Sequence, residues 1–358
     1  MTVAFRDVRK VFPDGTVALD GFNLTFESGE FVVLLGPSGS GKTTACRILA
    51  GLEQASNGTV EVDGRDVTDL PPRARGMSMV FQNYALYAHK SVYDNIAYPL
   101  RVRGWARGEI DGRVRAVARL VQIETLLGRR PRQLSGGEAQ RVAVARALVW
   151  EPSICLMDEP LSNLDAILRL QTRTQLKRLH TELGTTFVFV THDQEEAMTL
   201  GTRIAVLKDG RLVQFDTPRT IYHRPATRLV AEFIGRPAMN TIDGTIANGR
   251  FEAGDFTLPA PGRADGPVTL GIRHEHIGLR RAAAPETISF RLDVIEVVEP
   301  DMLLFVERGD VHLVVRTEAA PEGLGHDTEV HLAFPEDRLH LFATRDGARL
   351  AQGVPPAP

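Results

Sequence analysis

The sequence is poor in cysteine and has no long apolar run, and each shortage excludes a class of protein. Only two cysteines occur in 358 residues, Cys46 and Cys155, and both lie in apolar segments. A disulfide framework is therefore excluded, and both cysteines are interpreted as small buried hydrophobic residues. No run approaches the ~20 apolar residues of a transmembrane helix, and residues 1–10 lack the apolar core of a signal peptide. The sequence predicts a cytoplasmic protein that reaches a membrane only through partners.

The sequence also lacks an excess of charge of either sign. It has 42 lysines and arginines against 45 aspartates and glutamates, which gives a net charge of −3. This balance provides no general attraction to a polyanion, so nucleic acid is not an expected partner. With 43% hydrophobic and 24% charged residues, the composition is that of a globular protein. The length corresponds to two or three domains of ~150 residues.

The first two thirds of the chain alternate short apolar runs with helical patterns, which predicts an α/β layer architecture. Strands are expected at residues 31–35, 77–81, 154–157, 186–190 and 204–208. Helices are expected at residues 43–50, 110–127, 138–150, 165–183 and 193–200. The composition changes near Gly235, and short alternating segments punctuated by glycine and proline follow, which predicts a small all-β barrel with a loop at residues 254–267. The expected domains are residues 1–235 and 236–358.

Residues 36–43 read Gly-Pro-Ser-Gly-Ser-Gly-Lys-Thr and match the phosphate-binding loop pattern between an expected strand and an expected helix. The glycines let backbone N–H groups converge on a phosphate, to which the helix presents its positive end. Lys42, one of only five lysines, supplies charge between the β- and γ-phosphates, and Thr43 offers a hydroxyl to Mg²⁺. The alternative is a glycine-rich turn without a ligand. The expected nucleotide-binding residues here are Gly36, Pro37, Ser38, Gly39, Ser40, Gly41, Lys42, Thr43 and Thr44.

Two further expected strands end in residues that suit phosphate chemistry. Asp158 and Glu159 follow the apolar run 154–157, which suits Asp158 to hold Mg²⁺ and Glu159 to orient or deprotonate an attacking water. His192 follows the run 186–190, at the end where strands of an open α/β sheet present ligand-binding groups. An acidic strand end that faces solvent and a histidine with a structural role are the alternatives.

Residues 134–141, Leu-Ser-Gly-Gly-Glu-Ala-Gln-Arg, resemble the signature motif of ATP-binding-cassette (ABC) ATPases. Taken with the phosphate loop, Gln82, Asp158-Glu159, residues 162–165 and His192, this motif completes the order typical of that family. The resemblance implies an ABC-type nucleotide-binding domain with a helical subdomain. It also implies that a small OB-like regulatory and dimerisation domain follows; a pure dimerisation domain is the alternative.

The family resemblance also assigns roles to individual residues. It implies that catalysis uses Glu159, His192, Gln82 and Lys42, and that Mg²⁺ contacts Thr43, Gln82 and Asp158. It implies that Phe12 stacks on adenine and that Asp165 links two active sites, although Asp165 could equally stabilise the start of a helix.

The motif Ser135, Gly136, Gly137 and Glu138 forms a capping box, and the family implies that it contacts ATP held by a second cassette. Gln82, Asp165 and His192 complete the expected nucleotide-contacting set. Glutamate at position 138, where the family usually has glutamine, adds negative charge near that nucleotide.

Several segments indicate a branch of the family. Residues 84–87 and 91–96 resemble the surface on which importers receive their membrane subunits, and residues 233–240 and 271–277 resemble the carbohydrate-uptake branch, which includes maltose and sn-glycerol-3-phosphate ATPases. The implied function is ATP-driven import of a sugar or sugar-like solute. Alternatives are import of a polyamine or a metal ion, or a soluble cassette ATPase without a transport role.

The implied partners follow from that branch. They are a second copy or a related cassette, two transmembrane permease subunits, an extracytoplasmic solute-binding protein and a regulatory protein on the C-terminal domain. The implied location is the cytoplasmic face of the inner membrane, where the chain is peripheral.

Overall fold

The computed structural model describes residues 2–280, 282–318 and 323–350, which fall into two compact units, Met1–Pro218 and Arg219–Pro358. The division comes earlier than the composition change at Gly235. The reason is that helices α7 (Pro218–His223) and α8 (Arg228–Phe233) are tied to the second unit. The guanidinium of Arg273 donates to the backbone carbonyls of Ala231, Ile234 and Tyr222.

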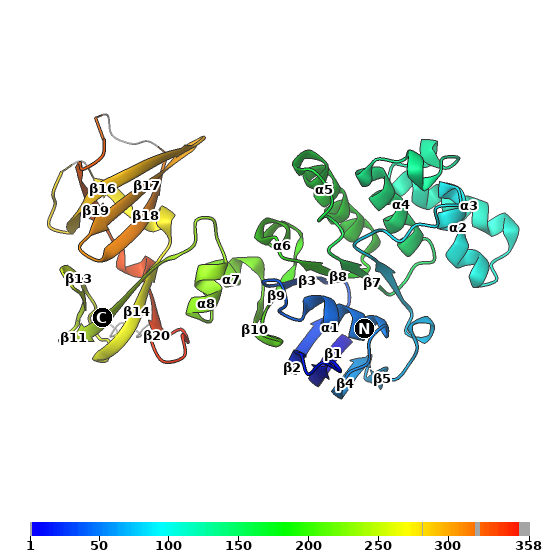
Figure 1. The fold of residues 1–358 in the computed structure, drawn as a ribbon, viewed down its shortest axis with the longest axis horizontal. Coiled ribbons are helices and arrows are strands. Elements are labelled where there is room, and N and C mark those ends of the chain that lie inside the picture. Colours follow the sequence, from blue (N-terminus) through cyan, green and yellow to red (C-terminus); the bar gives the residue numbers. More distant parts are fainter. Residues whose placement is uncertain (1, 281, 319–322, 351–358) are drawn as a thin grey trace. The chain divides into compact units, whose positions relative to one another are not determined.

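The first unit contains two sheets that share one core (Figure 1). The six-stranded sheet has the order β10-β9-β3-β8-β7-β6 and is parallel except for its edge strand β10. Its strands are β3 (Phe31–Leu35), β6 (Met77–Val80), β7 (Ile154–Asp158), β8 (Thr186–Thr191), β9 (Arg203–Lys208) and β10 (Arg211–Asp216). The antiparallel sheet has the order β2-β1-β4-β5, with β1 (Thr2–Val11), β2 (Val17–Glu27), β4 (Asn57–Val62) and β5 (Arg65–Asp66).

Helices cover both faces of the six-stranded sheet. Alternate residues of β3 show the two environments, because Val32 packs in the core that contains α1 (Lys42–Ala50), whereas the Phe31 ring meets His180 of α5 (Ala166–Leu183) at a centroid distance of 5.2 Å. Helix α6 (Gln194–Leu200) packs against β3 and β8. This layering confirms the expected α/β fold and places the carboxyl ends of β3, β7 and β8 at one edge.

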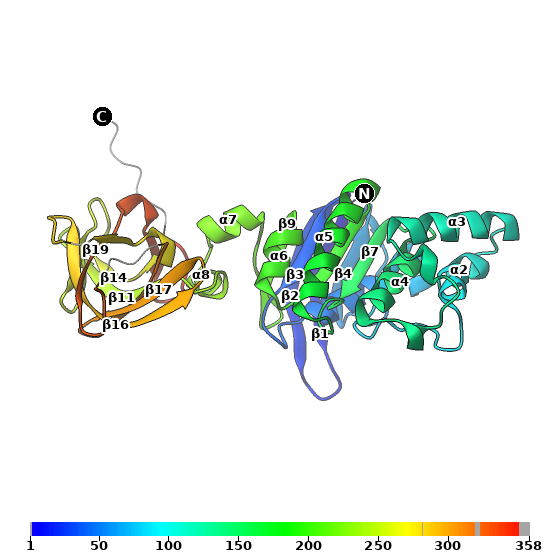
Figure 2. The ribbon, with the colours of Figure 1, turned by 90° about the horizontal axis from the view of Figure 1, so that it is seen from above.

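A helical subdomain interrupts the alternation between β6 and β7, as the family resemblance implies. It consists of α2 (Val92–Val102), α3 (Arg107–Leu120) and α4 (Gly136–Leu148), which pack on one another and lie together in both views (Figures 1 and 2). The helix expected at residues 110–127 is shorter, because Gln122 adopts a φ of +58° and turns the chain after Leu120.

The second unit is built from two five-stranded antiparallel sheets around a second core. One has the order β13-β12-β11-β14-β20 and comprises β11 (Asn240–Ala247), β12 (Arg250–Ala253), β13 (Phe256–Pro259), β14 (Gly266–Ile272) and β20 (His340–Ala343). The other has the order β15-β19-β16-β17-β18 and comprises β15 (Gly278–Arg280), β16 (Thr287–Val298), β17 (Asp301–Arg308), β18 (Val311–Thr317) and β19 (Glu329–Ala333).

One expectation about the second unit was wrong. Residues 254–267 were expected to form a loop, yet they contain β13, which pairs with β12. The pairing forms because Phe256 is fully buried in the core and Leu258 is nearly so. Among the residues that the structure describes, no helix is long and apolar enough to cross a membrane.

Candidate nucleotide site

The phosphate loop connects β3 to α1 and has a backbone that only glycine permits at two positions. A Cβ at Gly36 would lie 2.3 Å from the carbonyl oxygen of Leu207, and one at Gly41, whose φ is +95°, would lie 2.4 Å from the oxygen of Ala18. Both approaches are far inside van der Waals contact, so any side chain there would displace the loop. The residues expected to bind phosphate, Gly36, Pro37, Ser38, Gly39, Ser40, Gly41, Lys42, Thr43 and Thr44, occupy this loop and the first turn of α1.

The side chain of Lys42 folds back under the loop and donates hydrogen bonds to its backbone. Its side chain is 5% exposed, and its Nζ donates to the carbonyl oxygens of Gly36 (2.9 Å) and Pro37 (2.7 Å). Burial lowers the pKa of Lys42, while the nearby carboxylates of Glu159 and Asp158 act in the opposite direction. The Nζ of Lys42 also donates to the hydroxyl of Ser40 at 3.4 Å, so its hydrogen-bond partners are all uncharged. A buried ammonium with uncharged partners retains a strong attraction for an anion, which is the property that phosphate binding requires.

Asp158 lies directly opposite the loop at the end of β7. It is 5% exposed, and its Oδ1 accepts a hydrogen bond of 2.8 Å from the hydroxyl of Thr43. Burial raises the pKa of Asp158, and the bond from Thr43 and the charge of Arg47 oppose this rise. The structure thus brings together a hydroxyl and a carboxylate, which are oxygen ligands of the kind that Mg²⁺ prefers.

Glu159 and His192 meet beside this pair at the ends of adjacent strands. Glu159 Oε1 lies 3.4 Å from His192 Nδ1. The backbone of Glu159 has a φ of +45°, and its N–H donates to the carbonyl of Val190 at 3.1 Å. An unusual left-handed backbone at a charged residue is costly and is typical of functional positions. The side chain of His192 is 61% exposed, so this edge is open to a ligand.

Gln82 approaches the same edge from the segment after β6. Its Nε2 donates to the hydroxyl of Ser162 at 3.4 Å, and its backbone carbonyl accepts from Asn163 Nδ2 at 3.1 Å. Ser162 in turn donates to the carbonyl of Glu159 at 2.9 Å. A chain of hydrogen bonds therefore links Gln82 to the acidic strand end.

The signature segment forms the capping box that its sequence predicts. The N–H of Glu138 donates to Ser135 Oγ (3.3 Å), and the N–H of Ser135 donates to Glu138 Oε2 (2.7 Å). The hydrogen bond from Ser135 is the largest cause of the lowered pKa of Glu138. Gly136 and Gly137 pack against side chains that flank the start of α5, because a Cβ on either would lie 3.3–3.4 Å from Leu164 or Leu168.

Two residues that the resemblance assigned to the nucleotide site have other contacts here. Asp165 caps α5, since its Oδ1 accepts from the N–H of Leu168 at 2.9 Å, which agrees with the helix-stabilising alternative. Phe12 lies in the turn between β1 and β2, where the Nζ of Lys10 is 5.0 Å from the centre of its ring. Both residues remain predictions as nucleotide contacts.

Sequence reasoning missed Arg146, which positions the segment after Gln82. Its guanidinium donates to the carbonyls of Tyr84 (2.8 Å) and Ala85 (2.7 Å), and both residues have left-handed backbones. It also lies 5.6 Å from the centre of the Tyr87 ring. The available signal was a single arginine within the apolar run 142–148 of α4.

Arg146→Ala is expected to lower the free energy of unfolding by about 2–4 kcal/mol, because two charge-assisted hydrogen bonds to constrained carbonyls are lost. Urea denaturation measures this change. The matched control is Arg115→Ala, which removes an exposed pair with Asp111 and is expected to leave the free energy of unfolding almost unchanged. Equal effects of the two substitutions would remove Arg146 from this role.

Comparison with known proteins gives full-length relatives. The diacetylchitobiose uptake system ATP-binding protein MsiK of Streptomyces coelicolor is 43% identical over 98% of this chain and 99% of its own length. The sn-glycerol-3-phosphate import ATP-binding protein UgpC of Salmonella typhimurium is 46% identical over 96% of this chain and 98% of its own. The family model for ABC transporters matches residues 19–162. The chain belongs to the ABC transporter ATP-binding family.

The other comparisons concern the two domains of this ABC ATPase, the C-terminal OB domain and the nucleotide-binding cassette. The MalK OB fold domain matches residues 235–277. A component of the cbiONQ transporter complex from Clostridium perfringens superimposes with a TM-score of 0.57 and 28% identity, covering 61% of this chain and 89% of that one. A dimeric cassette solved in a post-hydrolysis state with ADP and Pi superimposes with a TM-score of 0.55 and 34% identity, covering 61% and 99%. The expected fold class is thereby confirmed.

Proposed function

We propose that this chain is the ATPase subunit of an importer that takes up a sugar or a sugar-like solute such as sn-glycerol 3-phosphate. The observation that carries the proposal is the meeting of the phosphate loop, Asp158, Glu159 and His192 at the ends of β3, β7 and β8. The names of MsiK and UgpC, which match over nearly the full chain, support the importer branch and the solute class.

In this proposal the loop holds the phosphates of ATP. Backbone N–H groups at the start of α1 and the ammonium of Lys42 face the β- and γ-phosphates. Thr43, Asp158 and the side-chain oxygen of Gln82 would hold Mg²⁺, and the buried hydroxyl–carboxylate pair fits that ion. When bound, Mg²⁺ neutralises charge on the phosphate oxygens.

Glu159 is the proposed general base. Its carboxylate accepts a proton from the water that attacks the γ-phosphorus in line with the departing ADP oxygen. His192 lies 3.4 Å from that carboxylate, from where it orients Glu159 and faces the transferred phosphoryl group. Gln82 positions the water, and its hydrogen bond to Ser162 keeps its side chain at this edge.

A second cassette completes the site in this proposal. The N-terminus of α4 presents the N–H groups of Gly136 and Gly137 to the γ-phosphate held by the partner, so that two chains enclose two ATP molecules. The dimeric cassette of known structure supports this arrangement. The proposed roles of Asp165 in linking the two sites and of Phe12 in stacking on adenine belong to the same closed state.

The membrane partners dock on the surface around α2 in this proposal. Tyr87, Tyr98 and Lys90 form a connected cluster there, with the two tyrosine rings 4.8 Å apart and the Lys90 Nζ 5.6 Å from the centre of Tyr98. Arg146 connects this cluster to the segment that carries Gln82. Two permease subunits, supplied by an extracytoplasmic solute-binding protein, would thus place the ATPase at the cytoplasmic face of the inner membrane. The OB domain would assist dimerisation and receive a regulatory protein.

Removal of the gene from its host is expected to abolish uptake of at least one of three labelled probes: sn-glycerol 3-phosphate, diacetylchitobiose or maltose. Uptake should return with the wild-type gene and not with Glu159→Gln, because import requires hydrolysis. The tagged chain should also copurify with two hydrophobic membrane proteins. Unchanged uptake of all three probes would contradict the solute class, and purification without membrane proteins would contradict the importer assignment itself.

A further inference from the structure

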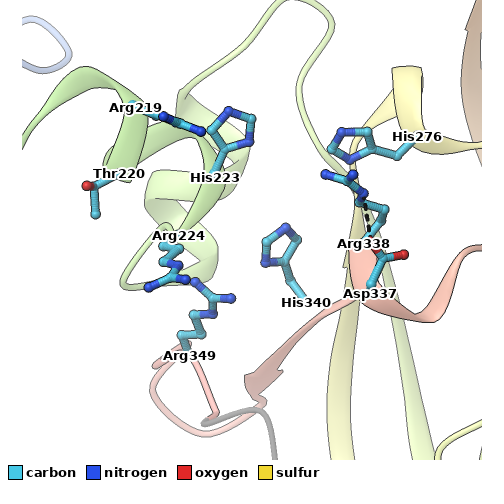
Figure 3. A pocket seen from close by; sticks show the side chains of 9 residues that line it. All are labelled: Arg219, Thr220, His223, Arg224, His276, Asp337, Arg338, His340 and Arg349. Atoms are coloured by element: carbon cyan, nitrogen blue, oxygen red, sulfur yellow. Dashed lines mark ion pairs between the residues drawn. The ribbon is translucent and has the colours of Figure 1, made fainter.

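A cavity within the second unit is lined almost entirely by basic side chains (Figure 3). Its volume is about 480 Å³, which is enough for a small ligand. We call it the basic pocket. Four segments contribute to its lining: α7 with the residue after it, the turn before β15, the start of β20 with the residues before it, and the chain after β20. The lining residues are Arg219, Thr220, His223, Arg224, His276, Asp337, Arg338, His340 and Arg349.

The charge of the basic pocket is unbalanced. Among the described residues that line it, four arginines carry positive charge and Asp337 is the one carboxylate, while burial lowers the pKa of His340 to about 4 and leaves that ring neutral near pH 7. That carboxylate is already paired with Arg338, whose Nε lies 3.1 Å from Asp337 Oδ2. Burial and the charge of the neighbouring Arg224 both lower the pKa of Arg349. Like charges held this close repel one another, and an anion between them would relieve the repulsion.

His340 provides a second, independent sign of a ligand. It is 7% exposed, and its Nδ1 has no hydrogen-bond partner among the described residues. The ring stacks on Phe342 with a centroid distance of 6.3 Å, which holds it in place at the start of β20. Figure 3 shows His340 in the middle of the basic pocket, with arginines and histidines from separate segments around it. A buried polar atom without a partner is costly, and a ligand bound in the basic pocket would satisfy this one.

The chemistry of the lining selects the ligand. Guanidinium groups pair with the oxygens of phosphate through parallel N–H donors, and several together favour a dianion over a monoanion. Apart from histidine, the described residues that line the basic pocket include no aromatic side chain that would stack on a base. The volume of about 480 Å³ fits a small molecule.

We propose that the basic pocket binds a small dianionic oxyanion of the phosphate or phosphate-monoester class. All of its residues belong to the second unit, Arg219–Pro358, whereas the phosphate loop belongs to the first. The proposal therefore does not rest on the transport function or on the ATP site. It assigns a binding role to residues that the nucleotide chemistry does not use.

Calorimetry on the full chain tests the proposal, with a non-hydrolysable Mg-ATP analogue at saturation so that the γ-phosphate position at the phosphate loop is filled as well. Inorganic phosphate and ethyl phosphate are titrated separately, and chloride and acetate at equal ionic strength serve as references. One further equivalent of phosphate or ethyl phosphate is expected to bind per chain. Tighter binding of inorganic phosphate identifies the free ion as the ligand, and tighter binding of ethyl phosphate identifies a monoester; both support the proposal.

Substitutions locate the site. Arg349→Gln and Arg224→Gln are each expected to weaken this binding by about 10-fold or more, since each removes a charged donor. Arg345→Gln makes the same charge change at an exposed position outside the basic pocket and is expected to change the affinity by less than about two-fold. If either pocket variant fails to fold by circular dichroism, Arg338→Gln, whose side chain is 49% exposed, takes its place. Binding no stronger than that of acetate, or unchanged in the pocket variants, would overturn the proposal.

Discussion

Replacement of Glu159 by glutamine is expected to lower the rate of ATP hydrolysis by about 10²–10⁴-fold and to leave ATP affinity nearly unchanged. Glutamine has the same size and can still contact His192, but it cannot accept the proton of the attacking water. Because ATP still binds, the variant should accumulate as a closed dimer. Phosphate release measures turnover, nucleotide titration measures affinity, and size-exclusion chromatography with ATP detects the dimer.

Glu195→Gln is the matched control for this experiment. Glu195 lies on α6, three residues after His192, and pairs with Arg173 at 2.8 Å on the surface. Its neutralisation makes the same chemical change without touching the site, so turnover should stay within about two-fold of the wild type. Hydrolysis at the wild-type rate in Glu159→Gln would remove Glu159 from its proposed role.

Lys42→Ala is expected to weaken ATP binding by about 10²-fold or more. The substitution removes the one ammonium that the fold buries beneath the phosphate loop, where a charge-assisted contact contributes about 1.5–3 kcal/mol per hydrogen bond. Lys42 also holds the carbonyls of Gly36 and Pro37, so the loop loses its internal donor as well. Isothermal calorimetry with Mg-ATP measures the affinity.

The matched control for Lys42→Ala is Lys177→Ala. Lys177 is also partly buried and donates to a backbone carbonyl, that of Leu200, at 2.8 Å. Its loss is expected to reduce stability to a similar degree and to leave ATP affinity unchanged. Circular dichroism confirms that both variants are folded. An unaltered affinity in folded Lys42→Ala would refute the assignment of the phosphate loop.

The central strands β3, β7 and β8 were predictable because they are buried on both faces. β3, β7 and β8 are continuous apolar runs in the sequence, as parallel strands between helical layers must be. The predicted runs 31–35, 154–157 and 186–190 match these strands to within one residue at either end. Their apolar residues indicate burial directly, so these strands can be predicted without knowing which helices and strands pack against them.

Elements whose formation depends on distant parts of the chain were harder to predict from the sequence. The apolar pattern of residues 110–127 continues past the end of α3, because Ile123 and Leu126 are buried after the turn at Gln122. The spacing of apolar residues alone cannot distinguish one long helix from a shorter helix followed by a buried turn. Strand β13 was missed for a related reason, since its burial depends on the core that β12 and the other strands supply.

The sequence by itself determined the local parts of the site. Glycines at positions 36 and 41, the capping box at Ser135–Glu138 and the carboxylates at the end of a buried strand all express constraints between close neighbours in the chain. Such constraints act through the backbone conformation and are readable from spacing. The order of these motifs along the chain resembles that of ABC ATPases, and it is this resemblance that indicated the family.

Only the tertiary structure decided which distant groups act together. The bond from Thr43 to Asp158 joins residues 115 apart, the approach of His192 to Glu159 joins residues 33 apart, and Arg146 reaches back about 60 residues to Tyr84 and Ala85. The basic pocket likewise gathers Arg224, His340 and Arg349 from segments that show no common pattern in the sequence. Burial and charge at these positions depend on which surfaces pack together, and that packing is a property of the whole fold.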